Sequence, residues 1–326
     1  MSVLPTYEDL VKAAQRLDGN AIKTKLIRSD IIDDMTGKTV WFKPECSQKV
    51  RAFKYRGAFN RLCVMSAVER AKGVVAYSSG NHAQGVSRSA KELRISAIII
   101  MPDDAPAVKV AGVRNDGAEI IFYDRARESR EDIAQTIHEE QGRIIVPSYD
   151  DPYIMAGQGT VGLEVAQSGT DFDALITCLG GGGLCAGISV AMNKLSPSTK
   201  IFGAEPEDYN DHQRSLKSGR RTPLTDFPPT LCDALMTPQP GELTWQINQK
   251  SLSGVFDVSD TACLFAMALA KREFGVQLEP GGAVAMAAVM EGAFSDDHSI
   301  ETICVVLTGG NVDPEIAQRA DALIKL

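Results

Sequence analysis

Short runs of aliphatic and β-branched residues alternate with longer amphipathic stretches along most of the chain. The short runs are typical of buried strands, and the longer stretches have the apolar spacing of helices that cover a sheet. The predicted strands are residues 39–43, 73–77, 95–101, 119–123, 143–146, 174–179, 200–204, 254–258 and 302–307. The helices between them include residues 66–72, 83–93, 107–116, 127–141 and 157–167. This order predicts an α/β fold with open, mostly parallel sheets flanked by helices.

The composition is that of an ordinary folded protein with a negative charge. The 326 residues are 44% apolar and 23% charged, and the formal net charge is −8. This charge argues against nucleic acid or an anionic membrane as the main partner. The first ten residues have no signal-peptide pattern and no apolar run could span a bilayer, so we expect a cytoplasmic protein. The seven cysteines lack metal-type spacing and are expected to be reduced, buried thiols.

Polar or glycine-rich phrases follow three of the predicted strands. They are Ser78-Ser79-Gly80-Asn81-His82 after residues 73–77, Gly180-Gly181-Gly182-Gly183 after residues 174–179, and Thr308-Gly309-Gly310-Asn311 after residues 302–307. In open α/β sheets, ligands collect at the carboxyl ends of the strands, and helix N-termini there favour anions. The three phrases are therefore predicted to border one crevice.

Two of the chain's features together indicate a particular cofactor. Lys54 lies in the phrase Ala52-Phe53-Lys54-Tyr55-Arg56-Gly57-Ala58, where an amine beside an aromatic ring could condense with an aldehyde. The backbone N–H groups of the four glycines, free of Cβ atoms, can converge on a phosphate. Pyridoxal 5'-phosphate needs both an amine and a phosphate site, so we expect this cofactor.

Two other classes of protein fit the chain less well. A nucleotide-binding oxidoreductase would need the spaced fingerprint G-x-G-x-x-G, whereas the glycines at 180–183 are contiguous. A non-catalytic binding protein on the same scaffold would be expected to have lost the lysine, and Lys54 is present.

The chain resembles the fold-type II pyridoxal-phosphate enzymes of the serine/threonine dehydratase and serine racemase family, which includes hydroxyaspartate dehydratases. The phrases at 52–58, 78–82, 180–183 and 308–311, with Ala156-Gly157-Gln158-Gly159-Thr160 and Glu279-Pro280-Gly281-Gly282-Ala283, follow the family's order. The resemblance implies a two-domain, tryptophan synthase β-like fold and a homodimer. It places a large cofactor-binding domain at residues 1–66 and 149–326, and a small mobile domain at residues 67–148.

The resemblance also implies roles for individual residues toward the cofactor. Lys54 would form the covalent bond and later act as the base, Asn81 would bind the ring hydroxyl, and Thr308 would face the pyridine nitrogen. A hydroxyl such as that of Thr308 cannot hold the nitrogen protonated as a carboxylate would, which favours elimination over a long-lived carbanion. The expected cofactor-binding set is Phe53, Lys54, Asn81, Gly180, Gly181, Gly182, Gly183, Leu184 and Thr308.

The phrase at 78–82 would bind the substrate's α-carboxylate through Ser78, Ser79, Gly80, Asn81 and His82. By resemblance, Ser79 would stand across the cofactor from Lys54, and two opposed bases are what racemisation requires.

Two arginines bear on the choice of substrate. Arg130 matches an arginine that reaches a second carboxylate in serine racemases, although a surface ion pair is an equal alternative. Arg51 would favour an acidic substrate if it faced the site, and it could equally point outward.

An acidic loop after residues 200–204 is similar to the divalent-cation site of serine racemases. Glu205 and Asp211 would supply carboxylates, and Tyr209 would supply its backbone carbonyl, to Mg²⁺, Ca²⁺ or Mn²⁺. A plain acidic surface loop is the alternative.

The activity expected from these resemblances is β-elimination from serine, threonine or 3-hydroxyaspartate, giving a 2-oxo acid and ammonia. The alternative is an amino-acid racemase that uses Lys54 and Ser79 as opposed bases.

Overall fold

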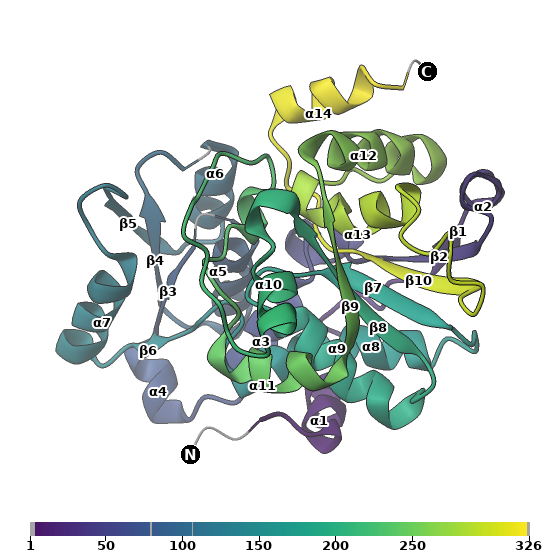
Figure 1. Cartoon of the computed structure of the whole chain (residues 1–326). Helices are drawn as coiled ribbons and strands as arrows, with labels where there is room; N and C mark the ends of the chain where they lie inside the picture. Colours follow the sequence, from purple (N-terminus) through teal and green to yellow (C-terminus); the bar gives the residue numbers. More distant parts are fainter. Residues whose placement is uncertain (1–3, 79, 106, 325–326) are drawn as a thin grey trace.

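The computed structural model describes residues 4–78, 80–105 and 107–324, which form two β-sheets that lie beside each other (Figure 1). In the larger sheet β1 is antiparallel to β2, and the other neighbours are parallel. The smaller sheet is parallel. The larger sheet has the order β1 (Ile27–Arg28), β2 (Thr39–Pro44), β10 (Thr302–Leu307), β7 (Ala174–Cys178), β8 (Lys200–Pro206) and β9 (Leu252–Val258). The smaller sheet has the order β5 (Glu119–Tyr123), β4 (Ala97–Pro102), β3 (Val74–Tyr77) and β6 (Ile144–Ile145).

Helices cover both faces of the larger sheet and surround the smaller one (Figure 1). In the larger sheet, α8 and α9 lie on one face, and α12 and α13 lie on the other. The helices that belong with the larger sheet are α1 (Tyr7–Leu17), α2 (Asp30–Thr36), α8 (Pro152–Ala166), α9 (Gly183–Leu195), α10 (Asp211–Ser218), α11 (Glu242–Ser251), α12 (Asp260–Phe274), α13 (Pro280–Met290) and α14 (Pro314–Asp321). The remaining helices are α3 (Lys54–Cys63), α4 (Ala67–Lys72), α5 (Asn81–Leu93), α6 (Ala107–Asn115) and α7 (Arg130–Gln141).

Burial on both faces explains why the central strands are continuous apolar runs. All five residues of β7 are buried, and so are five of the six residues of β10. Their side chains pack with those of α9, α12 and α13 in one large core. Because both faces of these strands lack water, an apolar residue is favoured at every position rather than at alternate ones.

The prediction of an α/β fold with mostly parallel sheets is confirmed. Every predicted strand is present, with ends that differ by at most three residues, while β1 was not predicted because two residues carry no periodic pattern. Helix α8 begins at Pro152, five residues before its predicted start at 157. The reason is local: the Asp151 side chain accepts hydrogen bonds from two N–H groups of the first turn, and Pro152 occupies the first helical position.

The two sheets divide the chain in sequence as well as in space. All four strands of the smaller sheet come from residues 74–145, and all strands of the larger sheet come from outside that stretch. The domain limits at residues 66/67 and 148/149, and the mobility of the smaller part, stay predictions.

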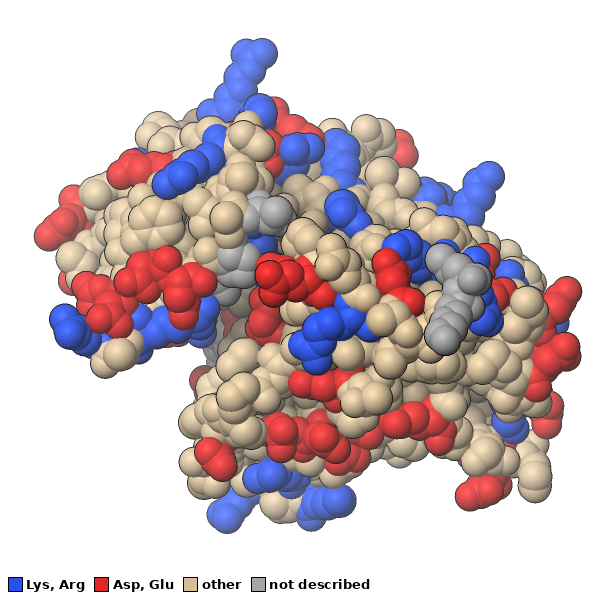
Figure 2. Space-filling model, turned by 90° about the horizontal axis from the view of Figure 1, so that it is seen from above, with Lys and Arg blue, Asp and Glu red and all other residues tan. Residues whose placement is uncertain are grey.

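The surface carries charges of both signs. On the face shown in Figure 2, acidic and basic side chains are interspersed over both halves of the molecule. Among the described residues, no helix is both long and apolar enough to cross a membrane.

Candidate active site

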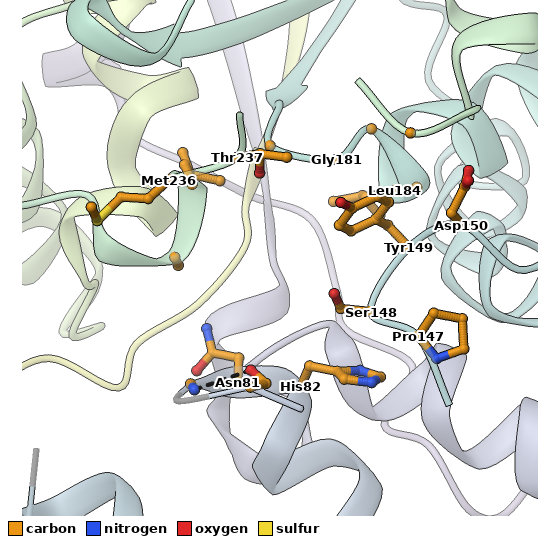
Figure 3. A pocket seen from close by; sticks show the side chains of 18 of the residues that line it. Asn81, His82, Pro147, Ser148, Tyr149, Asp150, Gly181, Leu184, Met236 and Thr237 are labelled. Atoms are coloured by element: carbon orange, nitrogen blue, oxygen red, sulfur yellow. Dashed lines mark hydrogen bonds between the residues drawn. The ribbon is translucent and has the colours of Figure 1, made fainter. Parts of the chain in front are cut away.

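A cavity of about 440 Å³ lies where β3, β7 and β10 end and where α5 and α9 begin. In Figure 3, Asn81 and His82 lie on one side of the cavity and Gly181 and Thr237 on the other, with Ser148 and Tyr149 between them. Most of the predicted site residues meet here: Phe53, Lys54, Ser78, Gly80, Asn81, His82, Arg130, Gly180, Gly181, Gly182, Gly183, Leu184 and Thr308. Ser79 lies outside the described residues.

Lys54 is held inside this cavity as the first residue of α3. Its backbone is fixed beside β10, because Ala52 forms a β-bridge with Gly309 and Phe53 N donates to Thr308 O at 3.2 Å. The Lys54 Nζ donates to Ser148 O at 2.8 Å. Burial lowers the pKa of Lys54 to about 8. A substantial fraction of the amine is therefore neutral near pH 8, as a nucleophile or a general base requires.

The glycine run forms the turn that leads into α9. Gly182 is the N-cap of α9, and in the described chain no side chain caps the first turn. The carbonyls of the run point away from the cavity toward α11, since Thr244 Oγ1 donates to Gly181 O at 2.6 Å and Asn248 Nδ2 donates to Gly182 O at 3.1 Å. The N–H groups of the turn and the positive end of the helix dipole are thus available to an anion.

Packing explains why two of these positions need glycine. A Cβ atom on Gly181 would lie 2.3 Å from the ring of Tyr149, and Gly182 has a left-handed φ of 88°. Tyr149 was not predicted, because its contact with the turn depends on the tertiary fold. Lys54 and this turn line the same cavity, so the residues present fit a cofactor that has both an aldehyde and a phosphate.

Asn81 is the first residue of α5 and belongs to a buried polar network. Its Nδ2 donates to Glu279 Oε1, and its Oδ1 accepts from Asn311 Nδ2 at 2.7 Å. Burial raises the pKa of Glu279 to about 7, and its Oε2 has no hydrogen-bond partner among the described residues. Glu279 and Asn311 stand in phrases quoted above, but their side-chain roles were missed, since only the fold brings residues 81, 279 and 311 together.

The start of α5 is a second helix N-terminus at the cavity without a side-chain cap. Its N-cap, Gly80, provides no side-chain cap, and Gly80 N donates to Ser78 Oγ at 3.2 Å. His82 Nε2 donates to Val146 O at 2.8 Å, and burial lowers the pKa of His82 to about 3. The imidazole is therefore neutral and fixed by the backbone. The predicted contacts of Ser78, Gly80 and His82 with a substrate carboxylate stay predictions.

Comparison with known proteins agrees with this geometry. Residues 17–309 match the family described as "Pyridoxal-phosphate dependent enzyme". The chain belongs to this family. It is 40% identical over 312 residues to an L-threo-3-hydroxyaspartate ammonia-lyase of Pseudomonas sp, covering 96% of this chain and 97% of the relative. It is 38% identical to a serine racemase of Schizosaccharomyces pombe, covering 96% of each. The structure of maize serine racemase superimposes with a TM-score of 0.93 at 34% identity, covering 98% of each chain.

The prediction of a fold-type II pyridoxal-phosphate enzyme of the dehydratase and racemase family is thus confirmed. The cofactor of this pyridoxal-phosphate enzyme is the one expected from Lys54 and the glycine run.

Two arginines of this pyridoxal-phosphate enzyme line the cavity. Arg130, at the start of α7, lies over the ring of Tyr77 with its guanidinium carbon 5.5 Å from the ring centre, and its Nε donates to Glu131 at 2.9 Å. Arg221, which was not predicted, lies on the loop before α11 and donates from Nε to Pro240 O at 2.9 Å. Arg51 is exposed and is not among the cavity-lining residues, so of its two predicted orientations the outward one is observed.

The structure also brings together two of the predicted cation ligands. Glu205, near the end of β8, and Asp211, at the start of α10, are fully buried, and both oxygens of Asp211 lack hydrogen-bond partners among the described residues. His212 completes the cluster with its Nδ1 3.2 Å from Glu205 Oε1. Burial alone would lower the pKa of His212, but the two carboxylates raise it to about 9. The sequence did not suggest His212, because one histidine in a polar helix has no distinctive pattern.

Proposed function

We propose that this protein eliminates water from a β-hydroxy-α-amino acid, giving a 2-oxo acid and ammonia, with 3-hydroxyaspartate as its preferred substrate. The observation that carries the proposal is one cavity in which a half-buried, partly neutral lysine lies between two helix N-termini without side-chain caps, with two arginines on its wall. The lysine would act as nucleophile and base. The two helix N-termini would bind the cofactor phosphate and the substrate α-carboxylate, and the arginines would bind a side-chain carboxylate.

We infer a place for each part of the cofactor from the residues that line the cavity. Gly180 to Gly183 with the start of α9 would hold the phosphate, and Phe53 would wall the ring. Asn81, held by Glu279 and Asn311, would bind the ring hydroxyl. When bound, the cofactor supplies an electron sink for the carbanion character that develops at the substrate Cα.

Lys54 does the proton chemistry in this proposal. Its Nζ would accept the Cα proton of the substrate, because burial keeps part of the amine neutral near pH 8. The β-hydroxyl then departs as water, and the proton gained by Lys54 is available to it. Meanwhile the substrate carboxylate is held by the N–H groups at the start of α5, which keeps Cα beside Lys54.

Arg130 and Arg221 give the preference for a side-chain carboxylate. Each has its Nε engaged by a neighbouring oxygen, so the guanidinium is oriented while its other N–H groups remain for a ligand. A guanidinium that binds a carboxylate with two N–H groups adds both geometric selection and charge. Two relatives named L-threo-3-hydroxyaspartate ammonia-lyase, each 40% identical to this chain, support the same substrate.

Removing either arginine is expected to cost far more with 3-hydroxyaspartate than with serine. Arg221→Ala and Arg130→Ala should each lower kcat/KM for 3-hydroxyaspartate roughly 10- to 100-fold, the value of a charged hydrogen bond, and lower kcat/KM for L-serine less than about threefold. Arg220→Ala is the matched control, since Arg220 is exposed and does not line the cavity. Equal losses with both substrates would contradict the carboxylate-binding role.

A substrate panel tests the reaction itself. The enzyme is incubated with L-serine, D-serine, L-threonine and the isomers of 3-hydroxyaspartate, and both 2-oxo acid and enantiomer ratio are followed. Elimination predicts that 2-oxo acid accumulates faster than the opposite enantiomer. The relatives named serine racemase favour the alternative, in which Lys54 and Ser79 act as opposed bases, and inversion that outruns 2-oxo acid formation would establish it.

We also propose a divalent cation, Mg²⁺, Ca²⁺ or Mn²⁺, at Glu205, Asp211 and the backbone carbonyl of Tyr209. The two fully buried carboxylates support it, because hard cations take oxygen ligands and a cation beside His212, which lies 3.5 Å from Asp211 Oδ2, would offset the burial of two negative charges. Mn²⁺ at 100 times its Kd should stabilise the wild type by about 2.7 kcal/mol and leave Asp211→Asn unaffected. Thermal denaturation measures this, with Asp208→Asn, an exposed neighbour, as the control. A shift that persists in Asp211→Asn would place the cation elsewhere.

The cytoplasmic location stays a prediction. We propose a homodimer, as the family resemblance implies. Sedimentation velocity of the holoenzyme would test the dimer.

A further inference from the structure

Two buried cysteines face each other behind the wall of the cavity. The Sγ atoms of Cys232 and Cys263 lie 3.8 Å apart, and both residues are fully buried. Cys232 lies just before the short helix η4 (Asp233–Leu235), and Cys263 lies in the first turn of α12. No other contact between two thiols is found among the described residues, which include all seven cysteines.

Residues 230 and 231, just before Cys232, form hydrogen bonds with Asp260 of α12. Thr230 Oγ1 donates to Asp260 Oδ1 at 2.8 Å, and Leu231 N donates to Asp260 Oδ2 at 2.9 Å. Cys232 N donates in turn to Thr230 Oγ1 at 3.1 Å. These hydrogen bonds hold Cys232 opposite Cys263, so a small movement would bring the two sulfur atoms into bonding distance.

The residues that follow Cys232 belong to the cavity wall. Asp233, Ala234 and Leu235 all line it, and Asp233 forms an ion pair with Lys109 of α6. Lys109 is 5% exposed, so this pair is largely shielded on the lysine side. The pair joins residues 233–235 of the cavity wall to a helix beside the smaller sheet, so a movement of Cys232 would change both this wall and its link to α6.

We propose that Cys232 and Cys263 form a reversible disulfide that acts as a redox switch on this cavity wall. The oxidant is a peroxide. Hydrogen peroxide first oxidises one thiol to a sulfenic acid and releases one water. The second thiol then attacks the sulfenic sulfur, forms the disulfide and releases a second water. The two thiols together lose two hydrogens and two electrons, and the peroxide is reduced to two waters.

The geometry determines the consequence of oxidation. A disulfide requires a sulfur–sulfur distance of about 2.05 Å, so the pair must close by well over 1 Å. Because Cys263 is held in a helix and Cys232 in a loop, Cys232 moves toward α12 and draws Asp233 away from Lys109. The pairing of the thiols with each other, together with burial, raises the pKa of Cys232, so the reduced pair rests protonated and oxidation is slow.

The test exposes the holoenzyme to hydrogen peroxide, blocks remaining thiols after denaturation, and locates the disulfide by peptide mass. We expect one disulfide between residues 232 and 263, a fall in kcat/KM of roughly 10- to 100-fold, and recovery with dithiothreitol. Cys263→Ala and Cys232→Ser should each retain activity after the same treatment. Cys63→Ala, which removes a partly exposed thiol of α3, is the matched control and should be inactivated like the wild type.

A further variant separates the formation of the disulfide from its effect on activity. Asp233→Asn removes the ion pair with Lys109, so its activity should already be lower and oxidation should lower it little further. Two alkylated thiols at 232 and 263 after full inactivation would overturn the proposal, and so would a disulfide that leaves kcat/KM unchanged. The disulfide is detected by mass whatever substrate the enzyme uses, so its presence does not depend on the proposed elimination.

Discussion

Replacing Lys54 by alanine is expected to abolish turnover, with a fall in kcat/KM of at least about 10³-fold. In the proposed reaction this side chain, whose Nζ lies 2.8 Å from Ser148 O, supplies both the amine that bonds the cofactor aldehyde and the base that takes the Cα proton. The proposed phosphate site at Gly180 to Gly183 and the start of α9 should be unaffected. The variant should therefore still bind the cofactor, but without the covalent bond.

Absorbance and mass measure this separation of functions. The visible band that marks the covalent bond to Lys54 should be missing from Lys54→Ala, and borohydride reduction should leave no cofactor attached to the peptide. Lys49→Ala is the matched control, because Lys49 lies on the ring of Tyr55 and pairs with Glu92 outside the cavity. A covalently attached cofactor in Lys54→Ala, or loss of the covalent bond in Lys49→Ala, would show that Lys54 is not the lysine that bonds the cofactor.

The fold could be predicted well from the sequence because its signals are local. Strands such as β7 and β10 are short apolar runs that begin after an acidic residue and end just before a glycine-rich phrase, and their limits in the structure lie within one residue of the predicted ones. Helix starts were less well predicted, since α8 begins where Asp151 and Pro152 set its first turn, before the apolar pattern becomes visible. The two-residue β1 exists only because it pairs with β2, so no local pattern could reveal it.

The site could be predicted only where its residues lie in contiguous phrases. Lys54, Asn81, the glycine run and Thr308 each follow or begin an element, and the fold gathers them as expected at one end of the strands. Two residues that were missed, Tyr149 and Arg221, stand in loops and meet the site through tertiary contacts alone. Tyr149 packs on Gly181, and Arg221 reaches the cavity from a loop without regular structure. Their identities carry no signal until the chain is folded.

A buried ion network beneath the lysine explains how Lys54 is kept in place. Arg56, two residues further along α3, donates to Glu45 at 2.7 and 2.8 Å and to Glu164 at 2.7 and 3.1 Å. The Arg56 and Glu45 side chains are 1% and 0% exposed, and Lys43 also pairs with Glu164. The forked guanidinium thus ties the first turn of α3 to the end of β2 and to α8.

Replacing Arg56 by methionine is expected to lower the free energy of unfolding by about 3–5 kcal/mol at pH 7, because it leaves Glu45 buried without its main cation. Equilibrium denaturation with urea measures the change. Arg125→Met is the control, since Arg125 and its partner Asp104 are both well exposed and their pair should contribute less than about 1 kcal/mol.

The pH dependence distinguishes a lost charge from a packing defect. Burial alone would raise the pKa of Glu45, but Arg56, with Lys43, lowers it below its usual 4.5. A folded-state pKa below the unfolded one stabilises the wild type above pH 4.5, and this contribution is lost as the pH falls through the folded value. In Arg56→Met, burial dominates and raises the pKa of Glu45, so the variant loses stability as the pH rises past 4.5. The difference between the two proteins should therefore shrink from pH 7 toward pH 4, whereas a packing defect would keep it constant.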